Sequence, residues 1–66
     1  MKKNLLLSEM ARMELNRNEM AQKLGITTQS LSNKMDCKTD FKLHELNKIR
    51  QILDLSPEKF DAIFFD

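Results

Sequence analysis

The chain has 66 residues and a mass of 7.8 kDa, which is enough for one domain and too little for a two-lobed enzyme with a cleft between its lobes. Its residues are 41% hydrophobic and 32% charged, with one glycine and one proline, a composition that favours a small helical core over tight hairpins. Such a core supplies roughly 3–5 kcal/mol of stability, so we expect the domain to gain more from a second copy of the chain.

The few residues with special chemistry exclude several classes of protein. The single Cys37 cannot form an intramolecular disulfide, and together with the single His44 it cannot complete a structural zinc site. No pair of side chains combines a nucleophile with a base, so we expect no metal, no cofactor, no small-molecule ligand and no enzymatic activity. The longest apolar run covers residues 5–7, too short for a membrane span or a signal peptide, and we therefore expect a cytoplasmic protein.

The formal net charge of +1 conceals an uneven distribution along the chain. Residues 17–42 carry five basic and three acidic side chains, whereas residues 43–66 carry three basic and five acidic ones. A polyanionic partner should therefore meet the middle of the chain and not its acidic end. Charge alone is equally compatible with an ordinary solvated surface.

Helical periodicity accounts for nearly every apolar residue and predicts an all-α fold of five short helices. In the first helix, Leu6, Met10 and Met13 form one apolar stripe. Asn16 followed by Glu19 is a capping-box arrangement, which predicts that the second helix begins there.

The second helix is expected to end at Gly25, because glycine tolerates the left-handed backbone conformation of a helix terminus. Ile26 then packs inward across the turn, and Thr27 is the expected N-cap of a third helix. That helix runs through Leu31 to Met35, and its other side is wholly polar.

Residues 36–40 are predicted to form a loop, and Phe41 is expected to anchor the far end of that loop in the core. A fourth helix follows over residues 42–53, with Leu43 at the start of its apolar stripe. Residues 56–58 read Ser-Pro-Glu, which predicts the start of a fifth helix because serine caps, proline fits the first position and an acid faces the helix dipole.

Three spacings around the second and third helices carry the functional prediction. Ala21 is small enough for the two helices to cross at close range, and Gly25 makes the sharp turn between them. Leu31 is the apolar residue that holds the third helix against the first two. Together they predict a helix-turn-helix whose second helix presents its polar side outward.

At these residues the chain resembles the Cro/repressor-type, lambda-repressor-like helix-turn-helix proteins (the XRE family) of bacteria and phages. The resemblance spans about residues 5–65 and is carried by residues 19–27, Glu-Met-Ala-Gln-Lys-Leu-Gly-Ile-Thr, and residues 29–31, Gln-Ser-Leu. It implies that residues 1–66 are a single five-helix DNA-binding domain that contacts double-stranded DNA, with its third helix in the major groove.

The resemblance also assigns roles to individual residues. The base-reading positions are Thr28, Gln29 and Asn33; glutamine and asparagine can pair with adenine, and a threonine methyl can touch a thymine methyl. Gln29 and Asn33 could instead be ordinary solvent-facing polar residues. The positions that the resemblance places on the DNA backbone are Asn16, Arg17, Thr27, Ser30, Lys34, Lys38, Thr39 and Lys42.

Two residues depart from the family pattern at the end of the third helix. Relatives usually have glycine where Cys37 stands, so either Asp36 takes the left-handed conformation or the loop follows another path. Lys34 occupies a position that is apolar in many relatives, and the inward role is expected to pass to Met35.

The fifth helix carries more aromatic surface than one short helix can bury against its own core. The residues expected at a dimer interface are Phe60, Ile63, Phe64 and Phe65.

The sequence thus predicts a transcriptional regulator, a repressor that binds an inverted-repeat operator as a homodimer in the cytoplasm. The alternative is a protein-interaction module on the same fold, antitoxin-like or antirepressor-like, that uses the same aromatic surface.

Overall fold

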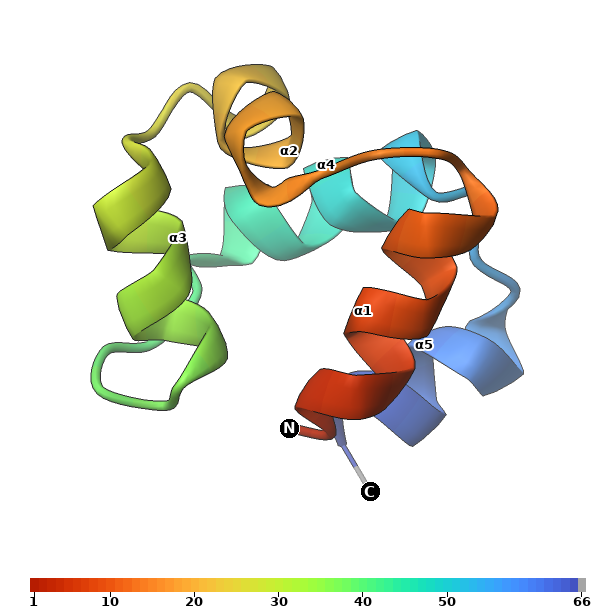
Figure 1. Ribbon diagram of the computed structural model, residues 1–66. Coiled ribbons are helices and arrows are strands. Elements are labelled where there is room, and N and C mark those ends of the chain that lie inside the picture. Colours follow the sequence, from red (N-terminus) through yellow and green to blue (C-terminus); the bar gives the residue numbers. More distant parts are fainter. Residues whose placement is uncertain (66) are drawn as a thin grey trace.

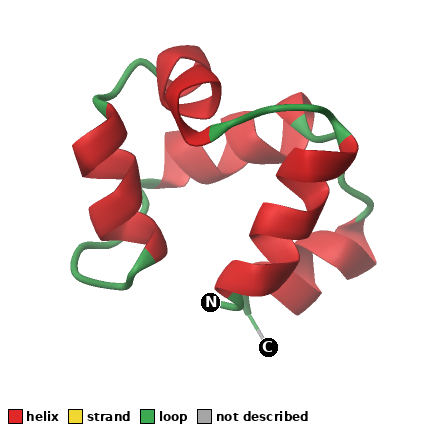
Figure 2. Ribbon diagram, viewed as in Figure 1, coloured by secondary structure: helices red, strands yellow, loops and turns green. Residues whose placement is uncertain are grey.

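The computed structural model describes residues 1–65 and confirms the predicted all-α class (Figures 1 and 2). Within these residues the chain forms helices joined by short loops and no strand. The helices are α1 (Lys3–Arg12), α2 (Arg17–Leu24), α3 (Thr28–Met35), α4 (Leu43–Ile52) and α5 (Pro57–Phe64).

The core lies at the centre of the bundle and receives at least one buried apolar side chain from every helix. Three methionines, Met10, Met20 and Met35, are at most 2% exposed and fill space between the helices, because an unbranched thioether side chain adapts to irregular gaps. The other buried apolar residues are Leu6, Ala21, Leu24, Leu31, Ile49, Leu53, Leu55 and Ile63.

Two residues expected in the core lie at the surface instead. Met13 is 39% exposed because α1 ends at Arg12 and the chain turns away immediately afterwards. Leu43 is 75% exposed because it is the first residue of α4, and the inward direction there belongs to Glu45, one turn before the buried Ile49.

The predicted helix starts are confirmed by side-chain caps. The Asn16 side chain accepts the Glu19 amide at 2.8 Å, and the Glu19 carboxylate accepts the Asn16 amide at 3.1 Å. Thr27 caps α3 by accepting the Ser30 amide at 3.0 Å, and Ser56 caps α5 ahead of Pro57. Each cap satisfies amide groups that have no partner inside the helix.

The first four helices end in the same left-handed conformation, which glycine favours, although the chain has only one glycine. A residue with positive φ follows each helix, and the next amide donates to a carbonyl of the last helical turn at 2.9–3.0 Å. Gly25 has the expected left-handed conformation, with φ of 74°. The residues in this conformation at the other three ends are Glu14, Cys37 and Asp54.

Of the two alternatives for the end of α3, a left-handed Asp36 was wrong. Asp36 has an ordinary φ of −86°, and Cys37 itself takes the left-handed conformation with φ of 62°. The Lys38 amide can reach the Asn33 carbonyl and close the helix end only if Cys37, the residue before Lys38, has positive φ. This backbone hydrogen bond therefore outweighs the preference of a cysteine side chain for negative φ.

Contacts at the chain ends join α1 to α5 and to the end of α3. The Lys2 amide donates to the Ile63 carbonyl at 2.7 Å, and the Lys3 ammonium lies 2.8 Å from the Asp36 carboxylate. In Figure 1 the N-terminus lies beside α5 at the bottom of the view, while α2 lies at the top. The predicted anchor Phe41 is half-buried and stacks edge-on against Phe64 of α5, with ring centroids 5.8 Å apart.

Candidate nucleic-acid interface

α2, the turn after it and α3 form a compact unit with the three features that the sequence predicted. Ala21 is 1% exposed, and its carbonyl accepts the Ile26 amide at 3.0 Å across the turn at Gly25. Leu31 is also 1% exposed and holds α3 against the rest of the core. The inner face of α3 is thereby fixed, and its opposite face points to solvent.

The residues predicted to read bases lie on that outward face of α3. Gln29 is exposed, and its Nε2 donates a hydrogen bond to Oδ1 of Asn33 at 3.1 Å, one helical turn later. This pairing leaves Oε1 and the second amide hydrogen of Gln29 available, which is the acceptor–donor pair that adenine binds in the major groove. The third predicted residue, Thr28, is half-buried, and its hydroxyl donates to Oδ1 of Asn18 in α2.

The N-terminal ends of α2 and α3 bring together four of the predicted backbone-contacting residues. Asn16 and Thr27 are exposed caps, and Ser30 lies half-buried in the first turn of α3. Arg17 reaches from α2 to α3, where its guanidinium donates to the Ser32 hydroxyl at 3.1 Å. Helix N-termini attract anions through their amide groups and dipole, so this arrangement is suited to phosphate oxygens.

Residues 36–42, called here the α3–α4 loop, carry the predicted backbone contacts Lys38, Thr39 and Lys42, which are all exposed. Cys37, also in the loop, is an exposed free thiol.

Lys34 is set apart from the other predicted backbone contacts. Its side chain is 9% exposed, and its ammonium lies 3.3 Å from the Glu45 carboxylate and 3.1 Å from the Asp40 carbonyl. A phosphate contact would require this ammonium to leave both partners, which counts against the expected backbone contact at Lys34. The expectation that Met35 alone takes the inward role is also corrected, because both residues are buried.

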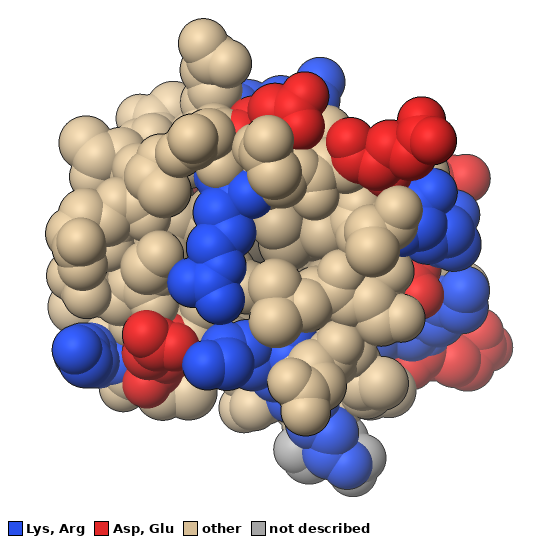
Figure 3. Space-filling model, viewed as in Figure 1, with Lys and Arg blue, Asp and Glu red and all other residues tan. Residues whose placement is uncertain are grey.

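Basic groups surround the C-terminal end of α3. The hydrogen bond and charge of Lys3 lower the pKa of the Asp36 carboxyl below its usual 3.8, slight burial opposes them, and the charges of Arg17 and Lys38 add to the lowering. In Figure 3, Lys and Arg side chains extend down the middle of the visible face between α3 and α1, and most of the visible acidic side chains lie on the side away from α3. This distribution favours a polyanion near α3.

The predicted dimer surface on α5 is only partly accessible. Phe65 is 70% exposed and lies against Phe60, with ring centroids 5.7 Å apart, while Phe64 is half-buried. Ile63, at 2% exposure, is a core residue and offers almost no surface to a partner.

The sequence interpretation did not identify Asn18, Ser32 or Glu45 as contributors to the site. Asn18 and Ser32 orient Thr28 and Arg17 across the helix crossing, and no local pattern reveals such a pairing. Glu45 could have been identified from the sequence, because this acidic residue lies four positions before Ile49, on the inward face of the fourth helix.

Within residues 1–65, no group of three or more His, Cys, Asp or Glu side chains is placed to hold a metal ion. None of the helices described is both long and apolar enough to span a membrane.

α2 and α3 are joined by a tight turn in which Gly25 has the left-handed conformation, and the polar side of α3 faces solvent. This arrangement defines a helix-turn-helix DNA-binding domain. The family model of the Cro/C1-type HTH DNA-binding domain matches residues 6–60, and the chain belongs to this family of DNA-binding regulators. Comparisons with curated proteins and with solved structures found no significant match.

Proposed function

We propose that the protein is a sequence-specific transcriptional repressor that binds an inverted-repeat operator as a homodimer. The observation that carries the proposal is the Gln29–Asn33 pair on the outward face of α3, since it directs an adenine-compatible acceptor and donor away from the protein. Repression needs only occupancy, because a dimer bound across a promoter excludes other proteins from the same DNA.

In this mechanism α3 enters the major groove, and Thr28, Gln29 and Asn33 contact base edges. Arg17 and the caps at Asn16 and Thr27 contact phosphates on either side of the groove and fix the register of α3. Phosphate contacts supply affinity for any duplex, and the base contacts discriminate among sequences.

Dimerisation is supported by the exposed aromatic edge of α5. Phe65 remains 70% exposed in a single chain, and a second copy that covers it would remove a large apolar side chain from water. A two-fold dimer would place its two α3 helices about 34 Å apart, one turn of B-DNA, so each half-site would meet one α3 helix.

Selection of bound sequences from a random duplex pool tests specificity and symmetry together. The expected result is an approximate inverted repeat with half-site centres about one helical turn apart. Sedimentation of the wild type and of Phe65→Asp, each with and without the selected duplex, tests the dimer: the wild type should bind as two copies and the variant should not. A wild type that binds as one copy on a palindromic duplex would refute the homodimer.

The alternative is a protein-interaction module that uses the same fold, and the exposed Phe65 and Leu43 favour it. A salt titration separates the two functions. Counterion release makes the logarithm of DNA affinity fall linearly with the logarithm of salt concentration, whereas a module that binds only proteins gives no DNA affinity to titrate.

A further inference from the structure

The base of the α3–α4 loop contains a buried pair of opposite charges. Lys34, in the last turn of α3, and Glu45, in the first turn of α4, are 8% and 2% exposed, and their charged atoms lie 3.3 Å apart. Every other buried side chain within residues 1–65 is apolar. The pair therefore occupies positions that two apolar residues would otherwise fill.

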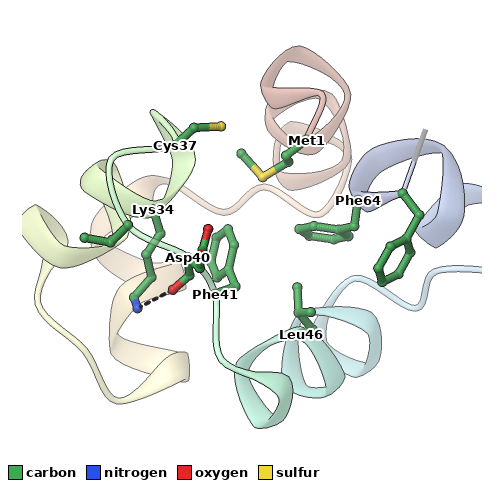
Figure 4. A pocket seen from close by; sticks show the side chains of 9 residues that line it. Met1, Lys34, Cys37, Asp40, Phe41, Leu46 and Phe64 are labelled. Carbon is green, nitrogen blue, oxygen red and sulfur yellow. Dashed lines mark hydrogen bonds between the residues drawn. The ribbon is translucent and has the colours of Figure 1, made fainter.

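The hydrogen bonds of this pair extend to the backbone of the loop. The Lys34 ammonium donates to the Asp40 carbonyl at 3.1 Å, as the dashed line in Figure 4 shows. The Glu45 carboxylate accepts the Lys42 amide at 2.8 Å. Two points of the loop, on either side of Phe41, are thus tied to one ion pair that joins α3 to α4.

The Lys34–Glu45 pair makes directional hydrogen bonds to the loop backbone, which apolar side chains at these positions could not make. Replacing a buried ion pair by well-packed apolar side chains is often neutral or stabilising, because the desolvation of both charges offsets their attraction. An apolar pair has no direction, however, and would leave the Asp40 carbonyl and the Lys42 amide without these partners. The distinctive contribution of the ion pair is therefore the path of the loop.

The loop that is held in this way carries three of the residues expected to contact phosphates. Lys38, Thr39 and Lys42 are exposed, and Lys42 is the residue whose amide Glu45 binds. A change in the path of the backbone between Asp40 and Lys42 would displace Lys42, whereas the amides of Lys38 and Thr39 stay bonded to the Asn33 carbonyl at the end of α3.

We propose that the Lys34–Glu45 ion pair positions the α3–α4 loop against the DNA backbone and thereby controls the strength of phosphate contact without contributing to base preference. Lys34 and Glu45 are positioning residues in this scheme, because neither touches DNA. The proposal rests on the DNA-binding function proposed above.

The test is the double variant Lys34→Met/Glu45→Met, which removes both charges, keeps the net charge and fills similar volume. Binding of the wild type and of the variant to the selected duplex is measured over a range of salt concentrations, together with thermal unfolding. The variant is expected to keep a cooperative unfolding transition and the selected base preference. Its affinity should be about tenfold weaker at 0.1 M salt, and its salt slope should be smaller by about one unit, the contribution of one phosphate contact.

Lys48→Gln/Glu58→Gln is the matched control, because it also keeps the net charge and both side chains are exposed and lie outside the predicted interface. It should leave the salt slope within experimental error of the wild type. A double variant that is folded and binds with the wild-type affinity and slope would overturn the proposal. A variant that loses base preference together with affinity would overturn it as well, because the ion pair would then be supporting α3 itself.

Lys34→Leu/Glu45→Leu provides a second route if the first double variant does not fold. It keeps the net charge, fills the space with a different apolar shape and removes the same two ties to Asp40 and Lys42, so the same reduction in affinity and slope is expected. An unchanged slope in this folded protein would contradict the proposal. Failure of the proposed function gives a different result, because the wild type itself would then show no salt-dependent binding.

Discussion

Cys37 holds a φ of 62° at the end of α3, and replacing it by glycine is expected to stabilise the domain. A side chain in the left-handed conformation costs roughly 1–2 kcal/mol, because its Cβ crowds the following carbonyl. Glycine removes that cost but loses about 0.5–1 kcal/mol through the greater freedom of its unfolded chain. Because the Cys37 side chain is exposed, little packing is lost, and the expected net gain lies between about 0 and 1.5 kcal/mol, with about 0.5–1 kcal/mol as the central value.

Thermal unfolding followed by circular dichroism measures this gain. For a domain of this size, about 0.5–1 kcal/mol corresponds to a rise in Tm of about 2–8 °C. Cys37→Ala is the control, because it removes the thiol but keeps the Cβ, and it should leave Tm nearly unchanged. A lower Tm for Cys37→Gly, or an equal rise for Cys37→Ala, would refute the argument from backbone strain.

Three further substitutions or conditions test the interface and the buried charges. Gln29→Ala should weaken binding to the selected duplex by about 1–3 kcal/mol and relax the preference at one base pair; an unchanged motif from repeated selection would contradict its base-reading role. Arg17→Ala should weaken binding to all duplexes and lower the salt slope by about one unit, and a loss confined to one base pair would be inconsistent with a phosphate contact. Burial raises the pKa of the Glu45 carboxyl, but the Lys42 amide, the Lys34 ammonium and the charge of His44 outweigh burial and hold it below the usual 4.5. The carboxylate therefore stabilises the fold above about pH 4.5, and that stability should be lost as the pH falls through the lowered pKa, which denaturant titrations of wild type and Glu45→Gln across acidic pH would measure.

The helix boundaries were predictable because their signals are local. The reciprocal cap of Asn16 and Glu19, the left-handed Gly25 and the Ser56 cap each depend on residues within one turn of one another. The predicted core was also largely right, since Met20 and Leu31 follow from helical spacing alone.

The features that sequence alone could not predict depend on contacts between helices. The pairing of Lys34 with Glu45 becomes visible only when the loop returns α4 to the end of α3, and the exposure of Leu43 follows from the same return. Cys37 shows a second limit. The low preference of cysteine for positive φ led to the expectation of a left-handed Asp36 or another loop path, but the hydrogen bonds of the helix end place the left-handed conformation at Cys37 itself. Residue roles on DNA remain predictions, which the experiments above address.

The hydrogen bond from the Lys2 amide to the Ile63 carbonyl has a consequence for the order in which the domain opens and closes. Joining the two ends of the chain closes a loop of nearly its full length, and the entropy cost of loop closure grows with length. The α2–α3 unit, in contrast, is built from neighbouring residues and forms through local contacts. Docking of α1 against α5 should therefore be a late event in folding and an early one in partial unfolding. In native-state hydrogen exchange, the Lys2 amide would then exchange sooner than the Ile26 amide in the turn before α3, because the α2–α3 unit stays folded after α1 has separated from α5.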